Sequence, residues 1–258
     1  MTPPSKEAPE LPEAPELSVI VPVRDEADNI LPLIGEIDQA LAGRWRFEMI
    51  YVDDGSRDQT AARLREAKVR YSHLRIVTHA RSCGQSAALL SGARQARGRT
   101  LVTLDGDGQN DPADIPKLLQ VQAEAEAGPA GCMASGIRVE RKDTATRRIA
   151  SKLANRIRGA LLKDGIQDSA CGLRVFPRET FLQMPYFDHI HRFLPALMIR
   201  EGGRVIGVPV NHRPRERGTS KYGLGNRLLV GVVDLFGVLW LLRRRRLAEV
   251  TVEEEQPS

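Results

Sequence analysis

The most informative residues are two aspartates with one residue between them. Asp105 and Asp107 directly follow the apolar run 100–104, and Gln109 lies two residues further on. Carboxylate and amide oxygens are the ligands that hard divalent cations prefer, so these three side chains predict a site for Mg²⁺ or Mn²⁺. The glycines at 106 and 108 allow the backbone to approach a ligand closely. A solvated acidic turn has the same composition, because turns favour Asp and Gly.

Two other acidic segments follow apolar runs in the same way. Arg24, Asp25 and Glu26 come after residues 17–23, and residues 53–56 (Asp-Asp-Gly-Ser) come after residues 47–52. Their carboxylates are able to accept hydrogen bonds from a ribose hydroxyl or a base nitrogen. The alternatives are an ordinary helix-start turn for the first segment and an N-cap turn for the second.

The elements that must position these residues are short buried strands alternating with helices. Strands are predicted at 17–23, 47–52, 74–78 and 100–104, because these runs are apolar and largely β-branched. Helices are predicted at 28–42, 60–71, 85–96 and 114–127. This alternation predicts an α/β fold of the Rossmann-like kind, with a mostly parallel central sheet and helices on both faces. The ligand crevice of such a sheet lies at the carboxyl ends of its strands, where the acidic segments would converge.

The second half of the chain is less regular. A basic helix is expected at 144–162, a polar turn entering a strand at 167–176, and a further strand at 204–210. Residues 214–225 are basic, glycine-rich and without periodicity, which indicates a loop. No internal repeat is present.

Length, charge and cysteine content limit the functional classes to which this protein can belong. The 258 residues, 41% of them hydrophobic, suffice for one catalytic domain with tails. A net charge of +5 indicates an anionic partner. Three widely spaced cysteines support neither a disulfide framework nor a Cys-x-x-Cys zinc site, and a reducing cytosol fits them best. A nucleic-acid-binding protein is disfavoured, because it leaves the acidic segments unexplained and only 5% of residues are aromatic.

The termini differ in character from the predicted domain at 17–226. Residues 1–16 are rich in Pro and Glu and are expected to be disordered, and residues 248–258 form an acidic tail. Residues 227–247 are predicted to form an amphipathic, membrane-interfacial helix. Its apolar part, 228–242, is shorter than the roughly 20 residues that a spanning helix needs, and it contains Trp240 and is followed by four arginines. A core helix or a helix that binds a partner protein are the alternatives.

The ordered motifs together resemble family 2 glycosyltransferases, in the dolichol- and polyprenyl-phosphate glycosyltransferase branch (dolichol-phosphate mannose synthase-like). The similarity covers about residues 17–222. The motifs are Val21-Pro22-Val23 with Asp25-Glu26, Asp53-Asp54-Gly55-Ser56, Gly84-Gln85, Asp105 to Gln109, Cys171 to Arg174 with Asp168, His191-Arg192-Phe193, and Arg215 to Tyr222. Two positions depart from the family pattern: Asp25 stands where Asn is frequent, and Gly106 stands where Ala is common. We expect the second departure to be mild, because the position is a turn.

The resemblance implies a GT-A type nucleotide-sugar-binding fold and an inverting, metal-dependent hexosyltransferase. The donor would be GDP-mannose or a UDP-hexose, and the acceptor a polyprenyl or dolichyl phosphate. By resemblance, the residues that bind the donor are Pro22, Asp25, Glu26, Asp53, Asp54, Gly84, Gln85, Asp105 and Ser220. Mg²⁺ or Mn²⁺ would be held by Asp105, Asp107 and Gln109, and catalysis would involve Asp107, Arg215 and Lys221.

A phosphate acceptor changes what catalysis requires. A phosphomonoester already carries a negative oxygen at neutral pH, so its attack needs positioning more than proton removal. Arginine binds phosphate with a planar fork, and by resemblance Arg138 and Arg156 are further candidates to contact the acceptor. If the acceptor is instead a saccharide hydroxyl, a general base is needed, and Asp168 is the candidate. Asp168 is equally typical of a carboxylate that merely holds an arginine-rich loop.

Three other functions share some of these features. A nucleotidyltransferase would open with a glycine-rich loop after its first strand, and none is present at 21–26. A family 2 transferase acting on a saccharide hydroxyl and a non-catalytic nucleotide-sugar-binding scaffold both remain open at this stage. The resemblance places the protein in the cytoplasm, peripheral on the inner face of the membrane. Its partner there would be the membrane surface or a membrane protein.

Overall fold

The computed structural model describes most of the chain from residue 14 onward. The described residues are 14–125, 128–139, 158–159, 161–162, 164–166, 168, 171–214 and 225–244. Most of the predicted basic helix at 144–162, most of the predicted loop at 214–225, the first 13 residues and the acidic tail lie outside them. The chain divides into two compact units, residues 1–221 and 222–258.

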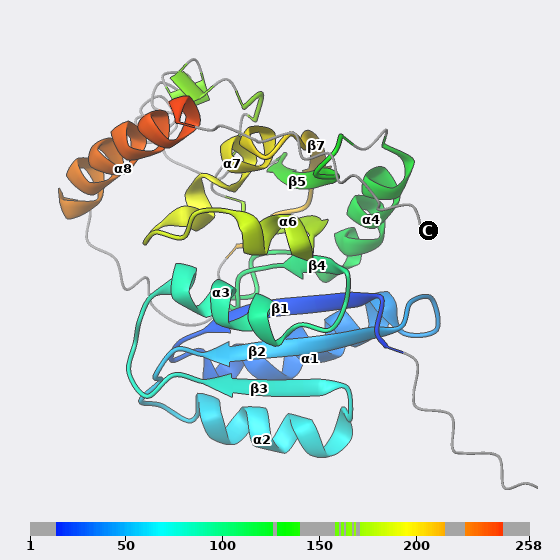
Figure 1. Ribbon diagram of the computed structural model, residues 1–258. Coiled ribbons are helices and arrows are strands. Elements are labelled where there is room, and N and C mark those ends of the chain that lie inside the picture. Colours follow the sequence, from blue (N-terminus) through cyan, green and yellow to red (C-terminus); the bar gives the residue numbers. More distant parts are fainter. Residues whose placement is uncertain are drawn as a thin grey trace, which may run out of the picture. The chain divides into compact units, whose positions relative to one another are not determined.

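The first unit contains a seven-stranded sheet. In the order of the sheet, the strands are β3 (Leu74–Thr78), β2 (Phe47–Asp53), β1 (Leu17–Val23), β4 (Thr100–Thr103), β6 (Arg174–Pro177), β5 (Cys132–Arg138) and β7 (Arg204–Val210). Every neighbouring pair is parallel except the two that involve β6. The prediction of a mostly parallel sheet is confirmed, and Figure 1 shows β1, β2 and β3 lying side by side.

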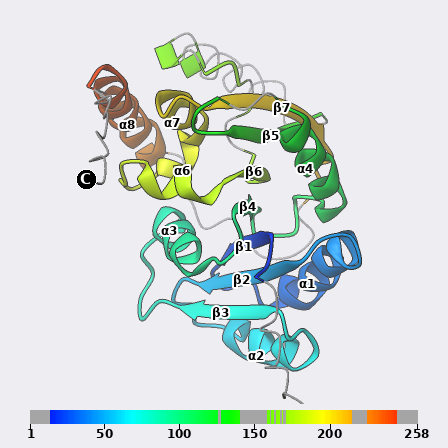
Figure 2. The ribbon, with the colours of Figure 1, turned by 45° about the vertical axis from the view of Figure 1, so that its right-hand side comes forward.

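Helices cover both faces of this sheet, as predicted. Figure 2 shows α3 (Gln85–Gln95), α6 (Arg178–Gln183) and α7 (Leu194–Arg200) on one side, and α1 (Ala27–Leu41) and α4 (Ile115–Glu124) on the other. Helix α2 (Thr60–Arg70) packs against α1 and β3. The short helices η1 and η2 occupy Pro112–Asp114 and Ile190–Arg192. Helix α1 buries Ile30, Leu33, Ile34, Ile37 and Leu41, the spacing of one helical face.

The register of the strands brings the acidic segments to the same end of the sheet. Val23 at the end of β1 is opposite Asp53 of β2, and Ile20 is opposite Thr103 at the end of β4. The interiors of these strands are almost completely buried, which explains their apolar, β-branched sequences. Residues 24–26, 53–56 and 104–111 therefore all leave the sheet at its carboxyl end.

Strand β5 was not predicted from the sequence. Its residues, Cys-Met-Ala-Ser-Gly-Ile-Arg, contain a single β-branched side chain. The structure explains the small residues, because a Cβ added at Gly136 would lie 2.8 Å from Cys171 Sγ and 3.0 Å from Val210 Cγ2. The small residues of β5 are therefore explained by the close approach of neighbouring segments and not by strand propensity.

Helix α8 (Gly225–Arg243) belongs to the second unit. It begins two residues before the predicted helix at 227–247, and its last described turn ends at Arg244. Val233, Phe236 and Trp240 expose 63%, 67% and 59% of their surface. Among the described residues, none of the helices has both the length and the apolar character required to cross a membrane.

Candidate active site

The segments after β1 and β2 are held together by hydrogen bonds. Asp25 N donates to Ser56 Oγ (2.9 Å), and Arg57 N donates to Asp25 Oδ1 (2.6 Å). Glu26 N donates to Thr60 Oγ1 (2.9 Å). Asp25 has a φ of +49°, which is uncommon for a residue with a side chain and often marks a functional turn. The two segments thus form one ordered surface at the carboxyl end of the sheet.

The predicted donor-binding residues Pro22 and Glu26 lie beside this surface. Glu26 Oε2 accepts a hydrogen bond from Asn29 Nδ2 (2.7 Å), which orients the carboxylate at the start of α1. Both side chains are partly buried. The structure therefore brings Pro22, Asp25 and Glu26 together.

Asp53 and Asp54, although adjacent, have different surroundings. Asp53 Oδ1 accepts Ser56 N (2.9 Å) within its own turn. The Asp54 carboxylate accepts four hydrogen bonds from the segment that joins β3 to α3. The donors are His79 Nδ1, Ser82 Oγ, Cys83 N and Gly84 N, at 2.7 to 2.9 Å. Asp54 therefore organises residues 79–84, and Gly84 begins α3 from this fixed position.

These hydrogen bonds set the charge of Asp54. Burial by itself would raise the pKa of the carboxyl, but the hydrogen bonds from Cys83 N, His79, Ser82 and Gly84 N outweigh burial and lower it. The carboxylate is thus ionised at neutral pH. Its occupied oxygens make it a structural anchor for the predicted donor-binding segment.

Asp54, His79 and Cys83 also bring possible metal-ligand atoms within 4.8 Å of one another. Imidazole and thiolate ligands suit zinc or copper more than Mg²⁺ or Mn²⁺. Both ring nitrogens of His79 are already engaged, by Asp54 and by Ser91 Oγ (2.9 Å). We therefore interpret this trio as a hydrogen-bonded network and not as a site for a hard cation.

The aspartate loop, defined as residues 105–111, follows β4. Gln85 Nε2 of α3 donates to Asp105 Oδ1 (2.8 Å), and Asp105 N donates to Asn110 Oδ1 (2.9 Å). Burial and the nearby Asp107 carboxylate raise the pKa of Asp105 to about 6, although Arg174, Gln85 and Arg138 act in the opposite direction. A positive charge beside Asp105 would therefore stabilise its ionised form.

Asp107 and Gln109 form the outer part of the same loop. Gln109 N donates to Asp107 Oδ1 (3.1 Å), which fixes the turn between them. Gln109 Nε2 donates to Arg213 O (3.4 Å), so the amide oxygen is the atom left to contact a cation. Asp107 also lines a cavity of about 250 Å³, together with Asn29, Pro32, Leu33, Glu36, Gly108, Arg213 and Pro214.

Gly106 lies tightly against the end of β1. That glycine in place of the family's common alanine is a mild departure stays a prediction, but in this chain an added Cβ would lie 2.5 Å from Val23 Cγ1 and 2.8 Å from Pro22 O. The aspartate loop packs so closely on the end of β1 that a methyl group requires the backbone to move. The glycine is therefore a packing requirement in this chain.

The second half of the chain closes over Asp105 from the other side. Thr103 Oγ1 donates to Gly172 O (2.8 Å), and the Asp105 carboxylate lies directly against the α-carbon of Gly172. The buried Arg174 donates through Nη1 to His191 O (2.8 Å). Asp105 is thus enclosed by α3, by its own loop and by residues 172–174.

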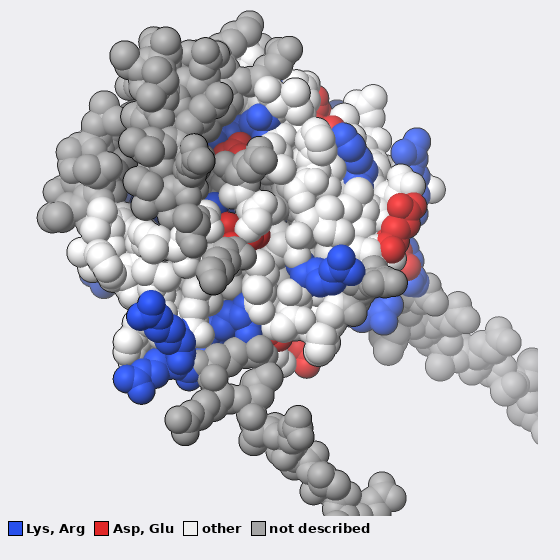
Figure 3. All heavy atoms as spheres, turned by 90° about the horizontal axis from the view of Figure 1, so that it is seen from above, with Lys and Arg blue, Asp and Glu red and all other residues white. Residues whose placement is uncertain are grey.

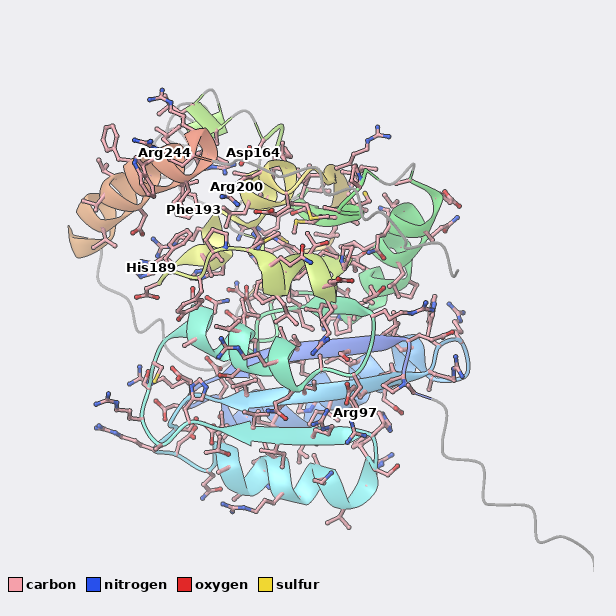
Figure 4. All side chains as sticks on the ribbon, viewed as in Figure 1. Arg97, Asp164, His189, Phe193, Arg200 and Arg244 are labelled. Atoms are coloured by element: carbon pink, nitrogen blue, oxygen red, sulfur yellow. The ribbon has the colours of Figure 1, made fainter. Side chains whose placement is uncertain are left out.

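His191 contacts the first turn of α3. Its Nδ1 lies 2.8 Å from Ser86 Oγ, one residue after Gln85. Burial, followed by the charges of Arg192, Arg174 and His189, lowers the pKa of His191 to about 3, so its ring is neutral at physiological pH. Figure 4 labels His189 and Phe193, which flank η2 and this histidine.

Arg138 and Asp168 form a nearly buried ion pair. Arg138 Nε and Nη2 donate to the two Asp168 oxygens at 2.6 and 2.8 Å, and Arg138 N lies 3.3 Å from Asp168 Oδ2. Asp168 was the candidate base for a hydroxyl acceptor, and Arg138 a candidate phosphate ligand. The geometry favours the structural alternative for Asp168, a carboxylate that holds an arginine. Arg156, Arg215, Ser220 and Lys221 lie outside the described residues.

Charges are unevenly spread on the face seen in Figure 3. A few carboxylates lie recessed near the middle of this face, and basic side chains are scattered around them. Sequence reasoning missed several residues that shape the site: Asn110, Gly172, His79 and Arg213. Gly172 lies in a motif of the resemblance and Asn110 directly follows one, but His79 and Arg213 give no signal of their own in the sequence.

Comparison with known proteins assigns the chain to a family. The family described as "Glycosyl transferase family 2" matches residues 18–183, the part of the chain that contains the three acidic segments. The chain belongs to this family. The family predicted from the sequence motifs of this glycosyltransferase is therefore confirmed.

Two relatives of this glycosyltransferase are polyprenyl-phosphate sugar transferases. It is 35% identical over 233 residues to the dodecaprenyl-phosphate galacturonate synthase of Rhizobium johnstonii, covering 88% of this chain and 68% of the relative. It is 33% identical over 226 residues to the undecaprenyl-phosphate 4-deoxy-4-formamido-L-arabinose transferase of Klebsiella pneumoniae, covering 87% and 67%. The chain spans about two thirds of the length of each.

Solved structures show the same GT-A type fold. Glucosyl-3-phosphoglycerate synthase of Mycobacterium tuberculosis, in complex with Mn²⁺, UDP and glucosyl-3-phosphoglycerate, has a TM-score of 0.65 at 17% identity over 88% of this chain and 80% of that one. The mannosyltransferase PcManGT of Pyrobaculum calidifontis, in complex with GDP-Man and Mn²⁺, has a TM-score of 0.63 at 23% identity over 95% and 69%. The predicted fold class is confirmed.

Proposed function

We propose that this glycosyltransferase moves a sugar from a nucleotide-sugar donor to the phosphate of a polyprenyl lipid, with inversion at the anomeric carbon. The named relatives support a lipid-phosphate acceptor. GDP-mannose and UDP-hexoses are the donors to test. The observation that carries the proposal is the aspartate loop, where two carboxylates lie together at the carboxyl end of the sheet, beside the ordered segments after β1 and β2.

Asp105, Asp107 and Gln109 would hold Mg²⁺ or Mn²⁺. The donor set fits a hard cation, because it offers two carboxylates and an amide oxygen on one tight turn. When bound, the cation would neutralise the negative charge that develops on the departing diphosphate. The protein's own part is positional: Gln85 and Gly172 fix the Asp105 carboxylate between them.

The segments after β1 and β2 would receive the nucleoside. Asp25 and Glu26 offer carboxylate oxygens, and Asp53 lies at the adjacent end of β2. Asp54 acts indirectly, by fixing Gly84 at the start of α3. In this arrangement the donor would lie between these segments and Asp105.

The acceptor phosphate would supply its own nucleophilic oxygen, so no general base is required. Asp168 is consistent with this mechanism, because Arg138 engages both of its oxygens and proton transfer to Asp168 would break the pair. Arg215, Ser220 and Lys221 remain our candidates for phosphate contacts. A lipid acceptor also requires contact with a membrane.

Helix α8 is the proposed contact with the cytoplasmic face of the membrane. Val233, Phe236 and Trp240 are exposed, and the guanidinium of Arg244 lies 5.8 Å from the centre of the Trp240 ring. Apolar side chains next to arginines suit the boundary between acyl chains and anionic headgroups. A membrane protein as partner is the alternative occupant of this helix.

The deciding experiment measures release of nucleoside diphosphate by the purified chain with each donor, with and without Mn²⁺ and polyprenyl phosphate. We expect release to need both the cation and the lipid phosphate, and we expect Asp107→Ala to abolish it while circular dichroism is unchanged. Release that depends on a saccharide but not on the lipid would favour a hydroxyl acceptor. Donor binding without any release would favour the non-catalytic scaffold.

A further inference from the structure

The segment that follows β7 is fastened to the aspartate loop. Arg213 N donates to Gln109 O (2.9 Å), and Gln109 Nε2 donates back to Arg213 O (3.4 Å). Asn110 and His212 form an antiparallel bridge next to these bonds. Asn211 Nδ2 donates to Asp111 Oδ2 (3.1 Å). The C-terminal part of the aspartate loop, residues 109–111, is therefore paired with residues 211–213.

The side chain of Arg213 adds a third element to this pairing. Its Nη1 donates to Glu36 Oε2 of α1 (2.6 Å), and its Nη2 donates to Asp111 Oδ1 (2.7 Å). One guanidinium thus joins α1, the aspartate loop and the segment after β7. The two carboxylates raise the pKa of Arg213 against the effect of burial, so the group remains charged.

We infer that Arg213 is a positioning residue for the cation site: its links to Glu36, Asp111 and Gln109 hold the aspartate loop in the geometry that binds the metal. The inference rests on the proposed function, because it takes Asp105, Asp107 and Gln109 as the ligands. The residues joined to the aspartate loop are followed at once by Pro214 and then by the predicted phosphate-binding residues, which start at Arg215.

A positioning role and a simple charge effect predict opposite results. A positive guanidinium near the site repels a divalent cation, so removing the charge alone would tighten cation binding. Loss of positioning would weaken binding, typically by about tenfold or more when a group that orients a ligand is removed. The direction of the change therefore separates the two roles.

The experiment measures the dissociation constant of Mn²⁺ by electron paramagnetic resonance of the free ion, with Mn²⁺ alone as the probe. We expect Arg213→Gln to weaken binding about tenfold. Arg213→Lys keeps the charge but lacks the planar fork that reaches two carboxylates, so it should also weaken binding. The matched control is Arg63→Gln, which removes an arginine that pairs with Glu66 on the exposed surface of α2 and should leave Mn²⁺ binding unchanged.

Thermal unfolding of each variant accompanies the binding measurement. Arg213 and Glu36 are more than a third exposed, so we expect the melting temperature to change little while the Mn²⁺ constant changes clearly. Unchanged or tighter Mn²⁺ binding by both Arg213 variants would overturn the inference. Asp107→Ala tests the underlying metal assignment separately: if it binds Mn²⁺ as well as the wild type does, the proposed function fails whatever the Arg213 variants show.

Discussion

Replacing Gly172 with alanine is expected to displace the Asp105 carboxylate while leaving the fold intact. A Cβ at position 172 would lie 2.4 Å from Asp105 Oδ2 and 2.5 Å from both Cγ and Oδ1. Ordinary van der Waals contact begins near 3.4 Å. The carboxylate must therefore move by about 1 Å, since 3.4 − 2.4 = 1.0. Gly172 does not have a positive φ, so its backbone can accept alanine.

The expected cost is functional because Asp105 is held at a fixed place. A shift of about 1 Å would break or stretch its 2.8 Å hydrogen bond with Gln85, and displacements of this size reduce rates about 100-fold. The assay compares Mn²⁺-dependent release of nucleoside diphosphate and the melting temperature in the wild type and in Gly172→Ala. The control is Gly237→Ala in α8, where no atom lies within 4 Å of the added Cβ.

The result that would refute this reasoning is specific. If Gly172→Ala retains turnover within about twofold of the wild type, then the position of Asp105 does not control the reaction, since a shift of about 1 Å should cost far more. A large loss of melting temperature would instead show that the methyl group is accommodated by unfolding of residues 171–174. The control variant should retain both activity and melting temperature.

Three further predictions test other parts of the structure. Asp54→Asn should lower the free energy of unfolding by about 1 to 3 kcal/mol at pH 6, because backbone and side-chain donors lose their carboxylate. The lowered pKa of Asp54 contributes stability that is present above pH 3.8 and is lost as pH falls through the folded-state pKa, so urea unfolding near pH 3 should show a smaller difference from the wild type than at pH 6. Arg138→Ala should cost about 3 to 5 kcal/mol in urea unfolding, since it leaves the nearly buried Asp168 carboxylate without its main partner, and a value near zero would contradict a structural role for the pair. Phe236→Ser with Trp240→Ser should reduce sedimentation with anionic vesicles several-fold, and undiminished sedimentation would argue against α8 as the membrane contact.

The first half of the fold could be predicted from the sequence to within a few residues. Strands β1, β2 and β4 are buried on both faces, so their sequences are apolar runs that stand out from the helices between them. The edge strand β3 is only partly buried, but its Leu-Arg-Ile-Val-Thr sequence is still rich in β-branched residues. In the second half, α6 and α7 have six and seven residues, too few to show a helical period. Strand β5 was missed because close packing against Cys171 and Val210 selects small residues there.

The candidate site also has one part that could be predicted from the sequence and one part that could not. The Asp105 and Asp107 motif places the candidate metal loop, because its spacing after a buried strand is visible in the chain itself. The adjacent Asp53 and Asp54 are indistinguishable in the sequence. Only in the folded protein does segment 79–84 donate its hydrogen bonds to the Asp54 carboxylate. The link through Arg213 depends on Glu36, which is 177 residues away, so no local pattern can reveal it.

The position of β6 has a practical consequence for dissecting this enzyme. Strand β6 pairs antiparallel with β4, and its residues come more than 70 positions later in the chain. A fragment ending near residue 125 would leave one side of β4 without a hydrogen-bonding neighbour, and its fully buried Leu101 and Val102 would meet water. Such an open strand is a template for intermolecular pairing, so a truncated donor-binding half is expected to aggregate, whereas fragments that retain β5, β6 and β7 should stay monodisperse.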